Sequence, residues 1–185
     1  MARDAQATRE RLVMAARKAF SIHGFERTTV REIAADAGVN PALINRYFGG
    51  KEQLLAEAVS IDLALPDLSQ ADRSELGKTL VAHFFQRWEG RQDGDLLRVL
   101  IRTAATNQDA ASRIRTILAD QVGTMVARVA GPERARERAC LIATQILGLA
   151  YARYVLGLSS DDLPHATALV MIGGTLQRYL VEELP

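Results

Sequence analysis

The stretch TTVREIAADAGVNPALINRYFGG, residues 28–50, decides the fold of the N-terminal part of this chain. It begins with a Thr-x-x-Glu pattern, in which Thr29 can accept a hydrogen bond from the backbone N–H of Glu32 while the Glu32 side chain reaches back. This capping box predicts a helix that starts after Thr29. Apolar residues with helical spacing follow, and Gly38 ends the pattern.

A second short helix follows in the same stretch, although it contains a proline. Asn40 is a strong N-cap residue, and Pro41 falls at the first helical position, where its missing N–H costs nothing. The glycine pair at 49–50 then stops the helix. Because Ile44 and Phe48 lie four residues apart, we expect both to pack inward.

The inward pair leaves the other side of this helix exposed. A short exposed helix that follows another helix after a tight, glycine-containing turn describes a helix-turn-helix, whose second helix enters the DNA major groove. Arginine pairs with guanine edges, asparagine with adenine, and leucine or alanine contacts a thymine methyl. The face that we expect to meet DNA consists of Asn40, Pro41, Ala42, Leu43, Asn45, Arg46 and, at its flank, Tyr47.

Phosphate contacts have candidates on both sides of this helix. Lys51 opens the next helix, where its ammonium group and the free backbone N–H groups can both meet a phosphate. Thr28 and Thr29 offer the same at the preceding helix. Residues 1–51 hold nine Lys+Arg against five Asp+Glu, a surplus that suits a polyanion. A helical corner with incidental surface polar groups remains the alternative.

The rest of the chain also has helical spacing, and no sustained apolar and polar alternation indicates a strand. We therefore predict an all-α fold, with a compact basic module of three short helices in front of a bundle of longer ones. Pro66 breaks the helix that Lys51 opens. The other helices are expected at about 8–23, 76–90, 95–107, 114–131, 132–158 and 162–184.

Composition argues against several classes of protein. Cys140 is the only cysteine, so an internal disulfide and a cysteine-rich zinc site are excluded. The charged N-terminus lacks the apolar core of a secretory signal, which predicts a cytoplasmic protein. The apolar segment 139–158 contains Arg153, whose cost near the centre of a membrane span is about 2.5–3.5 kcal/mol, so we predict a buried helix.

The sequence contains no recognisable arrangement of catalytic or metal-binding residues. The three histidines, His23, His83 and His165, are scattered, and no nucleophile or metal spacing surrounds them. We therefore predict neither an enzyme nor a bound cofactor or metal.

Residues 15–55 closely resemble the DNA-binding domain of TetR-family transcriptional regulators. The departures are Asn45, where family members commonly have a tyrosine used against the DNA backbone, and Pro41, where a lysine or small residue is frequent. Arg46 can then make the lost backbone contact or read a base. The matching positions are Phe20, Gly24, Thr28, Thr29, Ile33, Ala34, Gly38, Val39, Tyr47, Phe48, Lys51 and Leu54.

The resemblance implies a second, all-α domain that dimerises through its last two long helices and encloses a ligand pocket. It assigns residues 1–50 to the helix-turn-helix domain, 51–65 to a connecting fourth helix and 66–185 to ligand binding and dimerisation. The helices at 132–158 and 162–184 are the expected dimer interface. They contain Gly148, Gly173 and Gly174, each of which costs about 1 kcal/mol relative to alanine, and close helix approach would offset this cost.

Large apolar or amphipathic side chains supply candidate walls for the pocket, and polar ones can orient a ligand. Each is also typical of ordinary core packing. The candidates are His83, Phe84, Trp88, Arg102, Met125 and Tyr151.

These features predict a repressor that binds a near-palindromic DNA operator as a homodimer and leaves it when a small-molecule effector binds. No membrane partner is expected. The alternative is a DNA-binding dimer, architectural or constitutive, without a ligand-controlled switch.

Overall fold

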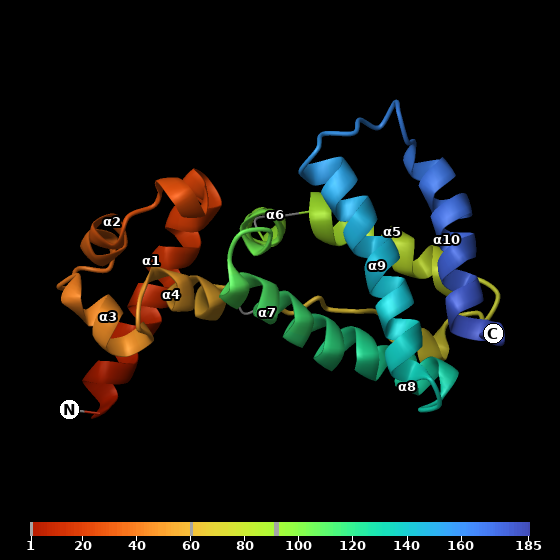
Figure 1. The fold of residues 1–185 in the computed structure, drawn as a ribbon, viewed down its shortest axis with the longest axis horizontal. Helices are drawn as coiled ribbons and strands as arrows, with labels where there is room; N and C mark the ends of the chain where they lie inside the picture. The colour runs from red at the N-terminus through yellow and green to blue at the C-terminus, as the bar shows by residue number, and fades with distance from the viewer. Residues whose placement is uncertain (1, 60, 91–92) are drawn as a thin grey trace. The chain divides into compact units, whose positions relative to one another are not determined.

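The computed structural model describes residues 2–59, 61–90 and 93–185, and these form helices and connecting segments without a strand (Figure 1). The predicted all-α fold is confirmed. Contacts divide the chain into an N-terminal unit, residues 1–61 with 92–114, and a C-terminal unit, residues 62–91 with 115–185. The division differs from the one expected at residue 66, because α6 (Asp93–Ala104) packs on α1 (Ala2–Arg27) in the N-terminal unit.

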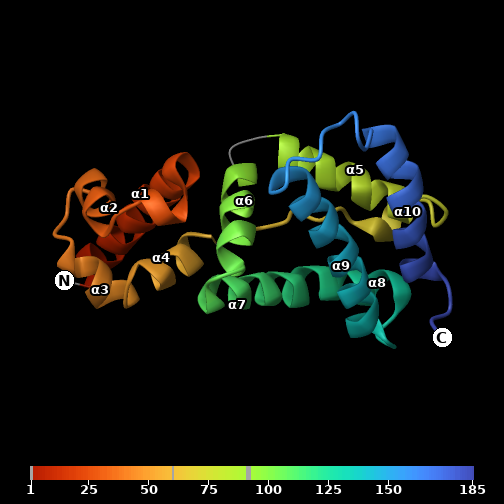
Figure 2. The same cartoon turned by 45° about the horizontal axis from the view of Figure 1, so that its top comes forward.

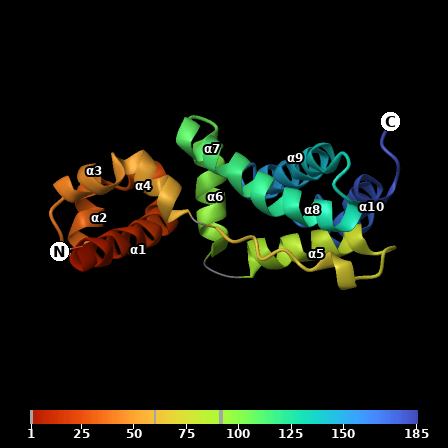
Figure 3. The same ribbon diagram turned by 90° about the horizontal axis from the view of Figure 1, so that it is seen from below.

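The first four helices of the N-terminal unit are α1, α2 (Val30–Asp36), α3 (Ala42–Phe48) and α4 (Lys51–Ala58). Figure 3 shows α2, α3 and α4 on one side of α1. Helix α1 is longer than the expected 8–23, and Gly24 breaks its regular course with a φ of 75°, a conformation that glycine adopts without strain. Fully buried side chains from all four helices form the core: Leu12, Ala16, Phe20, Ile33, Ala34, Ile44, Leu54 and Leu55.

The prediction that the fourth helix extends over 51–65 is wrong, since α4 ends at Ala58. Two arginines from other helices bind the carbonyls at this end. Arg17 Nε donates to Ala58 O at 2.6 Å, and Arg113 Nε donates to Val59 O at 3.1 Å. The last carbonyls of α4 therefore find partners without another helical turn.

The C-terminal unit contains the short helix η1 (Leu68–Gln70), α5 (Leu76–Glu89), the π-turn η2 (Leu118–Val122), α8 (Gly123–Ala130), α9 (Ala135–Tyr154) and α10 (His165–Val181). Helix α7 (Gln108–Ile117) begins in the N-terminal unit and leads into η2 and α8. Together these three segments form the helix expected at 114–131, which begins earlier than expected, at Gln108, and ends at Gly131 as predicted. Helices α9 and α10 are a few residues shorter than expected at both ends.

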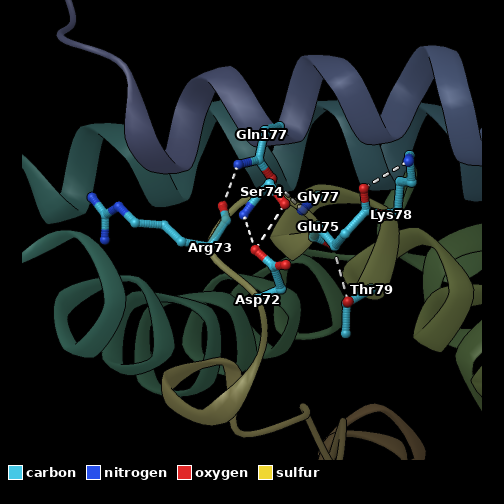
Figure 4. Close-up of polar contacts among 8 residues, drawn as sticks. All are labelled: Asp72, Arg73, Ser74, Glu75, Gly77, Lys78, Thr79 and Gln177. Atoms are coloured by element: carbon cyan, nitrogen blue, oxygen red, sulfur yellow. Dashed lines mark hydrogen bonds and ion pairs between the residues drawn. The ribbon is translucent and has the colours of Figure 1, made fainter.

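Helix α5 crosses α10 at close range (Figure 2). A Cβ atom on Gly77 would lie 2.0 Å from Gly173 O, so the two backbones touch. The Gln177 side chain of α10 joins them further, because its oxygen accepts from the Gly77 N–H at 2.9 Å and its amide nitrogen donates to Arg73 O at 2.6 Å (Figure 4). Gly173 therefore allows α5 and α10 of the same chain to pack closely. Its assignment to the dimer interface is corrected.

Candidate nucleic-acid interface

The start of α2 has the capping box that the sequence predicts. The Glu32 N–H donates to Thr29 Oγ1 at 3.2 Å, and the Thr29 N–H donates to Glu32 Oε2 at 2.8 Å. A hydrogen bond from the Thr29 N–H and a weaker contribution from the Thr29 hydroxyl hold the pKa of the Glu32 carboxyl below its usual value. Thr29 is exposed at this helix start, where a phosphate can approach it.

Thr28, in contrast, cannot contact a phosphate with its side chain. Only 1% of the residue is exposed, and its hydroxyl donates to Gly24 O at 2.7 Å and to Ala19 O at 3.2 Å. Its N–H donates to Phe25 O at 3.3 Å. Thr28 closes the end of α1, and its assignment as a phosphate contact is corrected.

The turn between α2 and α3 positions the second helix. Gly38 adopts a left-handed φ of 65°, and the Val39 N–H closes the end of α2 by donating to Ala34 O at 2.9 Å. Asn40 Oδ1 accepts from the Ala42 N–H at 2.8 Å, and Pro41 is already helical, with a φ of −53°. Asn40 thus caps α3 as the sequence predicts.

The two faces of α3 differ in burial. Ile44 is fully buried, whereas Phe48, expected inside, is half-buried and lies beneath the Arg9 guanidinium group. Asn45 and Arg46 are exposed, and neither side chain forms a hydrogen bond or an ion pair with the described part of the chain. Of the other predicted DNA contacts, Asn40, Pro41 and Ala42 are exposed, and Leu43 and Tyr47 are half-buried at the flanks.

Lys51 is the first residue of α4, as predicted. Its Nζ atom lies 4.3 Å from the ring centroid of Phe25, which holds the ammonium group by a cation–π contact. The side chain is only half-buried. Lys51 thus places a positive charge at a helix N-terminus whose first N–H groups lack intrahelical partners.

The candidate ligand residues are spread over α5, α6, α8 and α9. Phe84 and Trp88 are buried in a ring cluster, where Trp88 stacks on Tyr154 at 4.8 Å between centroids. His83 Nε2 lies 2.9 Å from Leu63 O. Arg102 is exposed on α6 of the N-terminal unit, Met125 is buried on α8, and Tyr151 is exposed on α9.

Arg153, beside this ring cluster, pairs with a carboxylate. Its Nε lies 3.3 Å from Glu89 Oε1, and its guanidinium group lies 5.1 Å from the Phe85 ring centroid. Burial raises the pKa of the Glu89 carboxyl, but hydrogen bonds from Tyr154 and His165, together with the charges of His165 and Arg153, outweigh burial, so the pKa lies below its usual value.

A pocket of about 280 Å³ lies elsewhere in the C-terminal unit. The segment before α5 forms one of its walls, and η2 and α8 supply the other. Of the six predicted ligand residues, only Met125 lines it. Sequence reasoning missed this wall because it extended the fourth helix to residue 65. The lining residues are Asp62, Leu65, Pro66, Asp67, Leu68, Asp120, Gln121, Thr124, Met125, Arg128 and Val129.

Two sequence families together match most of the chain. Residues 12–58 match the family described as bacterial regulatory proteins, tetR family. Residues 74–180 match the family described as Tetracyclin repressor-like, C-terminal domain. This chain belongs to the TetR family. The resemblance noted in the sequence is confirmed over both parts of the protein.

Curated relatives of this TetR-family chain are regulators as well. The HTH-type transcriptional regulator BetI of Brucella anthropi is 29% identical over 175 residues, which cover 88% of this chain and 89% of the relative. BetI of Brucella suis biovar 1 is 30% identical over 173 residues, which cover 88% of this chain and 87% of the relative. The prediction of a transcriptional regulator rather than an enzyme is therefore confirmed.

Solved structures share the fold over nearly the whole chain. A TetR-family regulator from Streptomyces coelicolor A3 has a TM-score of 0.55 at 27% identity and covers 95% of both chains. A transcriptional regulator from Rhodococcus sp. Rha1 reaches 0.62 at 22% identity, with 96% of this chain and 99% of the other covered. The low identity of the Rhodococcus protein limits it to evidence for the fold.

One further structural relative is NalD, the secondary repressor of the MexAB-OprM multidrug efflux pump in Pseudomonas aeruginosa. It has a TM-score of 0.61 at 19% identity and covers 97% of this chain and 100% of NalD. This likeness also concerns the fold alone. None of the helices in the described ranges has the length and apolar character of a membrane span.

Proposed function

We propose that this TetR-family regulator is a repressor that binds a near-palindromic operator as a homodimer and is released by a small-molecule effector. The observation that carries the proposal is the exposed face of α3, where Asn45 and Arg46 project from a capped and anchored helix. A guanidinium group at this place can pair with a guanine edge or a backbone phosphate. Asn45 is shorter than the tyrosine common in the family, so Arg46 is the stronger candidate for the principal contact.

Candidate phosphate contacts lie at both ends of the helix-turn-helix and suit this orientation on DNA. Lys51 lies at the start of α4, and Thr29 is exposed at the start of α2. Such contacts fix the register of the reading helix without carrying sequence information. In a dimer, two copies of α3 would meet successive major grooves about 34 to 36 Å apart, or slightly more.

Exposed apolar side chains on α9 and α10 support the homodimer. Tyr151 of α9 and Val170 and Met171 of α10 expose 41%, 60% and 66% of their surfaces, and burial of such large side chains against a second copy would be favourable. A Cβ atom on Gly148 or Gly174 would meet nothing within 4 Å, so both backbones are open to a partner helix. We expect Met171→Asp to raise the dimer dissociation constant in sedimentation equilibrium, and an unchanged constant would contradict this interface.

The pocket beside η2 and α8 supports an effector site in the C-terminal unit. Asp62, Asp67 and Asp120 line it together with Arg128, which gives it polar groups to orient a ligand, and Met125 adds an apolar surface. An effector must bind the DNA-free state more tightly than the DNA-bound state in order to release the operator.

The proposal is tested by selecting DNA from a random pool with the purified protein and then screening small molecules by thermal shift. We expect a near-palindromic selected sequence, and at least one compound that raises the melting temperature and releases that DNA. Selection of non-palindromic DNA would overturn the dimeric repressor. Compounds that stabilise the protein without releasing DNA would favour the alternative of a constitutive DNA-binding dimer.

A further inference from the structure

Arg9 of α1 joins three parts of the N-terminal unit through one guanidinium group. Its Nε donates to Glu57 Oε1 at 2.8 Å and a terminal nitrogen donates to Glu57 Oε2, so the ion pair with α4 is bidentate. The other terminal nitrogen donates to Tyr47 O at 2.9 Å. The guanidinium carbon also lies 4.7 Å from the ring centroid of Phe48.

Two of these contacts hold the C-terminal end of α3. Tyr47 O is among the last carbonyls of that helix, which have no intrahelical partner and carry a partial negative charge. A cation at this end gives the carbonyl a hydrogen-bond donor and interacts favourably with the negative end of the helix dipole. Phe48, which packs beneath the same guanidinium group, is the last residue of α3.

A helix as short as α3 depends on such contacts for its orientation. Its seven residues form about two turns, which are marginal without tertiary packing. Asn40 fixes its first turn, Ile44 is buried at its middle, and Arg9 binds its last turn. Glu57 in turn holds the Arg9 fork in place from α4.

We propose that Arg9 and Glu57 position the recognition helix for DNA and do not contact DNA themselves. The proposal rests on the DNA-reading role of α3 proposed above. Arg9 and Glu57 each expose 39% of their side chains, and a pair this accessible contributes little to overall stability. We expect the ion pair to act mainly on the orientation of α3. That orientation sets how well Asn45 and Arg46 can contact bases and phosphates of DNA.

The chemistry of arginine is necessary for this role. The planar guanidinium group presents donors in several directions, so it can reach both oxygens of Glu57 and Tyr47 O at once. A lysine ammonium group keeps the positive charge but cannot reproduce that fork. A charge-preserving substitution thus separates positioning from a direct phosphate contact.

The test uses the full-length protein and its selected operator in fluorescence anisotropy titrations at several salt concentrations. The variants are Arg9→Lys, Glu57→Gln and the double variant, and Arg11→Lys is the matched control on the same helix. Arg11 is exposed and its guanidinium group bonds only weakly to Thr8 Oγ1, at 3.4 Å. Melting temperatures are measured for every variant.

We expect Arg9→Lys and Glu57→Gln each to weaken operator binding about two- to fivefold, which is the order that an accessible ion pair can contribute. The double variant should bind no worse than Arg9→Lys, because both changes break one contact. The slope of log affinity against log salt should stay as in the wild type, and Arg11→Lys should bind normally. The result for Glu57→Gln is the most informative, since removing a negative charge near DNA would otherwise strengthen binding.

Wild-type affinity in Glu57→Gln, or stronger binding, would overturn the positioning role. So would additive losses in the double variant. Arg46→Ala separates this proposal from the one on which it rests. If Arg46→Ala weakens binding and Glu57→Gln does not, only the positioning role fails, whereas an unaffected Arg46→Ala variant shows that α3 does not read DNA.

Discussion

Asn40 begins α3 by accepting a hydrogen bond from the Ala42 N–H through its side-chain oxygen, at 2.8 Å. Asn40→Ala leaves this donor without its cap, and such a loss costs about 1 kcal/mol. We expect urea denaturation to show this decrease in the free energy of unfolding. Asn40→Ser, which keeps a capping oxygen, should remain close to the wild type. Equal stability of the alanine variant would show that the bond does not support α3.

The buried hydroxyl of Thr28 predicts an effect on stability rather than on DNA binding. Thr28→Val keeps the shape of the side chain but deprives Gly24 O and Ala19 O of their donor. Buried groups left unpaired cost about 1–3 kcal/mol, so the midpoint of urea denaturation should fall. The salt dependence of operator binding should not change. A flatter salt dependence would restore Thr28 as a phosphate contact.

The crossing of α5 and α10 predicts opposite responses at two glycines. In Gly77→Ala the new methyl group would meet Gly173 O at 2.0 Å, and overpacking of this kind costs at least about 1–3 kcal/mol. Gly123→Ala is the matched control, because a Cβ atom there would meet only Leu118 O, at the ordinary contact distance of 4.0 Å. We expect thermal melting to show a large loss for the first variant and none for the second. Similar melting temperatures for both would contradict the close crossing.

The Glu89 contacts predict a dependence of stability on pH. Because the pKa of this carboxyl is lower in the folded protein, its contribution is present above the unfolded pKa and is lost as the pH falls through the folded pKa. Glu89→Gln removes this titration. Urea denaturation between about pH 6 and pH 3 should therefore show a smaller loss of stability in the variant than in the wild type. Parallel curves would mean that the Glu89 contacts do not stabilise the fold.

Features encoded by neighbouring residues were predictable from the sequence. The capping box of α2, the Asn40 cap and the glycine ends depend on residues within a few positions of one another. The burial of Ile44 follows from helical spacing. These features were enough to predict the helix-turn-helix and the face that it exposes.

Features that depend on distant residues could not be predicted from local patterns. Helix α4 ends at Ala58 because Arg17 and Arg113 bind its last carbonyls, and neither arginine is near in sequence. A glycine is needed at position 173 because α5 of the same chain crosses α10 there, and not because a partner molecule packs against it. The pocket was missed for the same reason, since one of its walls is the irregular segment that replaces the end of the expected fourth helix.

Two cationic side chains should differ in their effect on DNA binding. Lys51 lies at a helix start suited to phosphate, so Lys51→Ala should weaken binding to all sequences and reduce the salt slope by about one. Arg46 projects from the face of α3. If it reads a base, Arg46→Ala should also relax the preference at one position of the half-site, at a cost of about 1–3 kcal/mol. Binding to selected and scrambled DNA distinguishes the two effects.

The most direct test of the central claim, that α3 reads the operator, is an anisotropy titration of Arg46→Ala against the wild-type protein on the selected operator. We expect at least about tenfold weaker binding by the variant, with an unchanged melting temperature, since the Arg46 side chain has no partner among the described residues. Equal affinity of the two proteins for that DNA would contradict the assignment of this face.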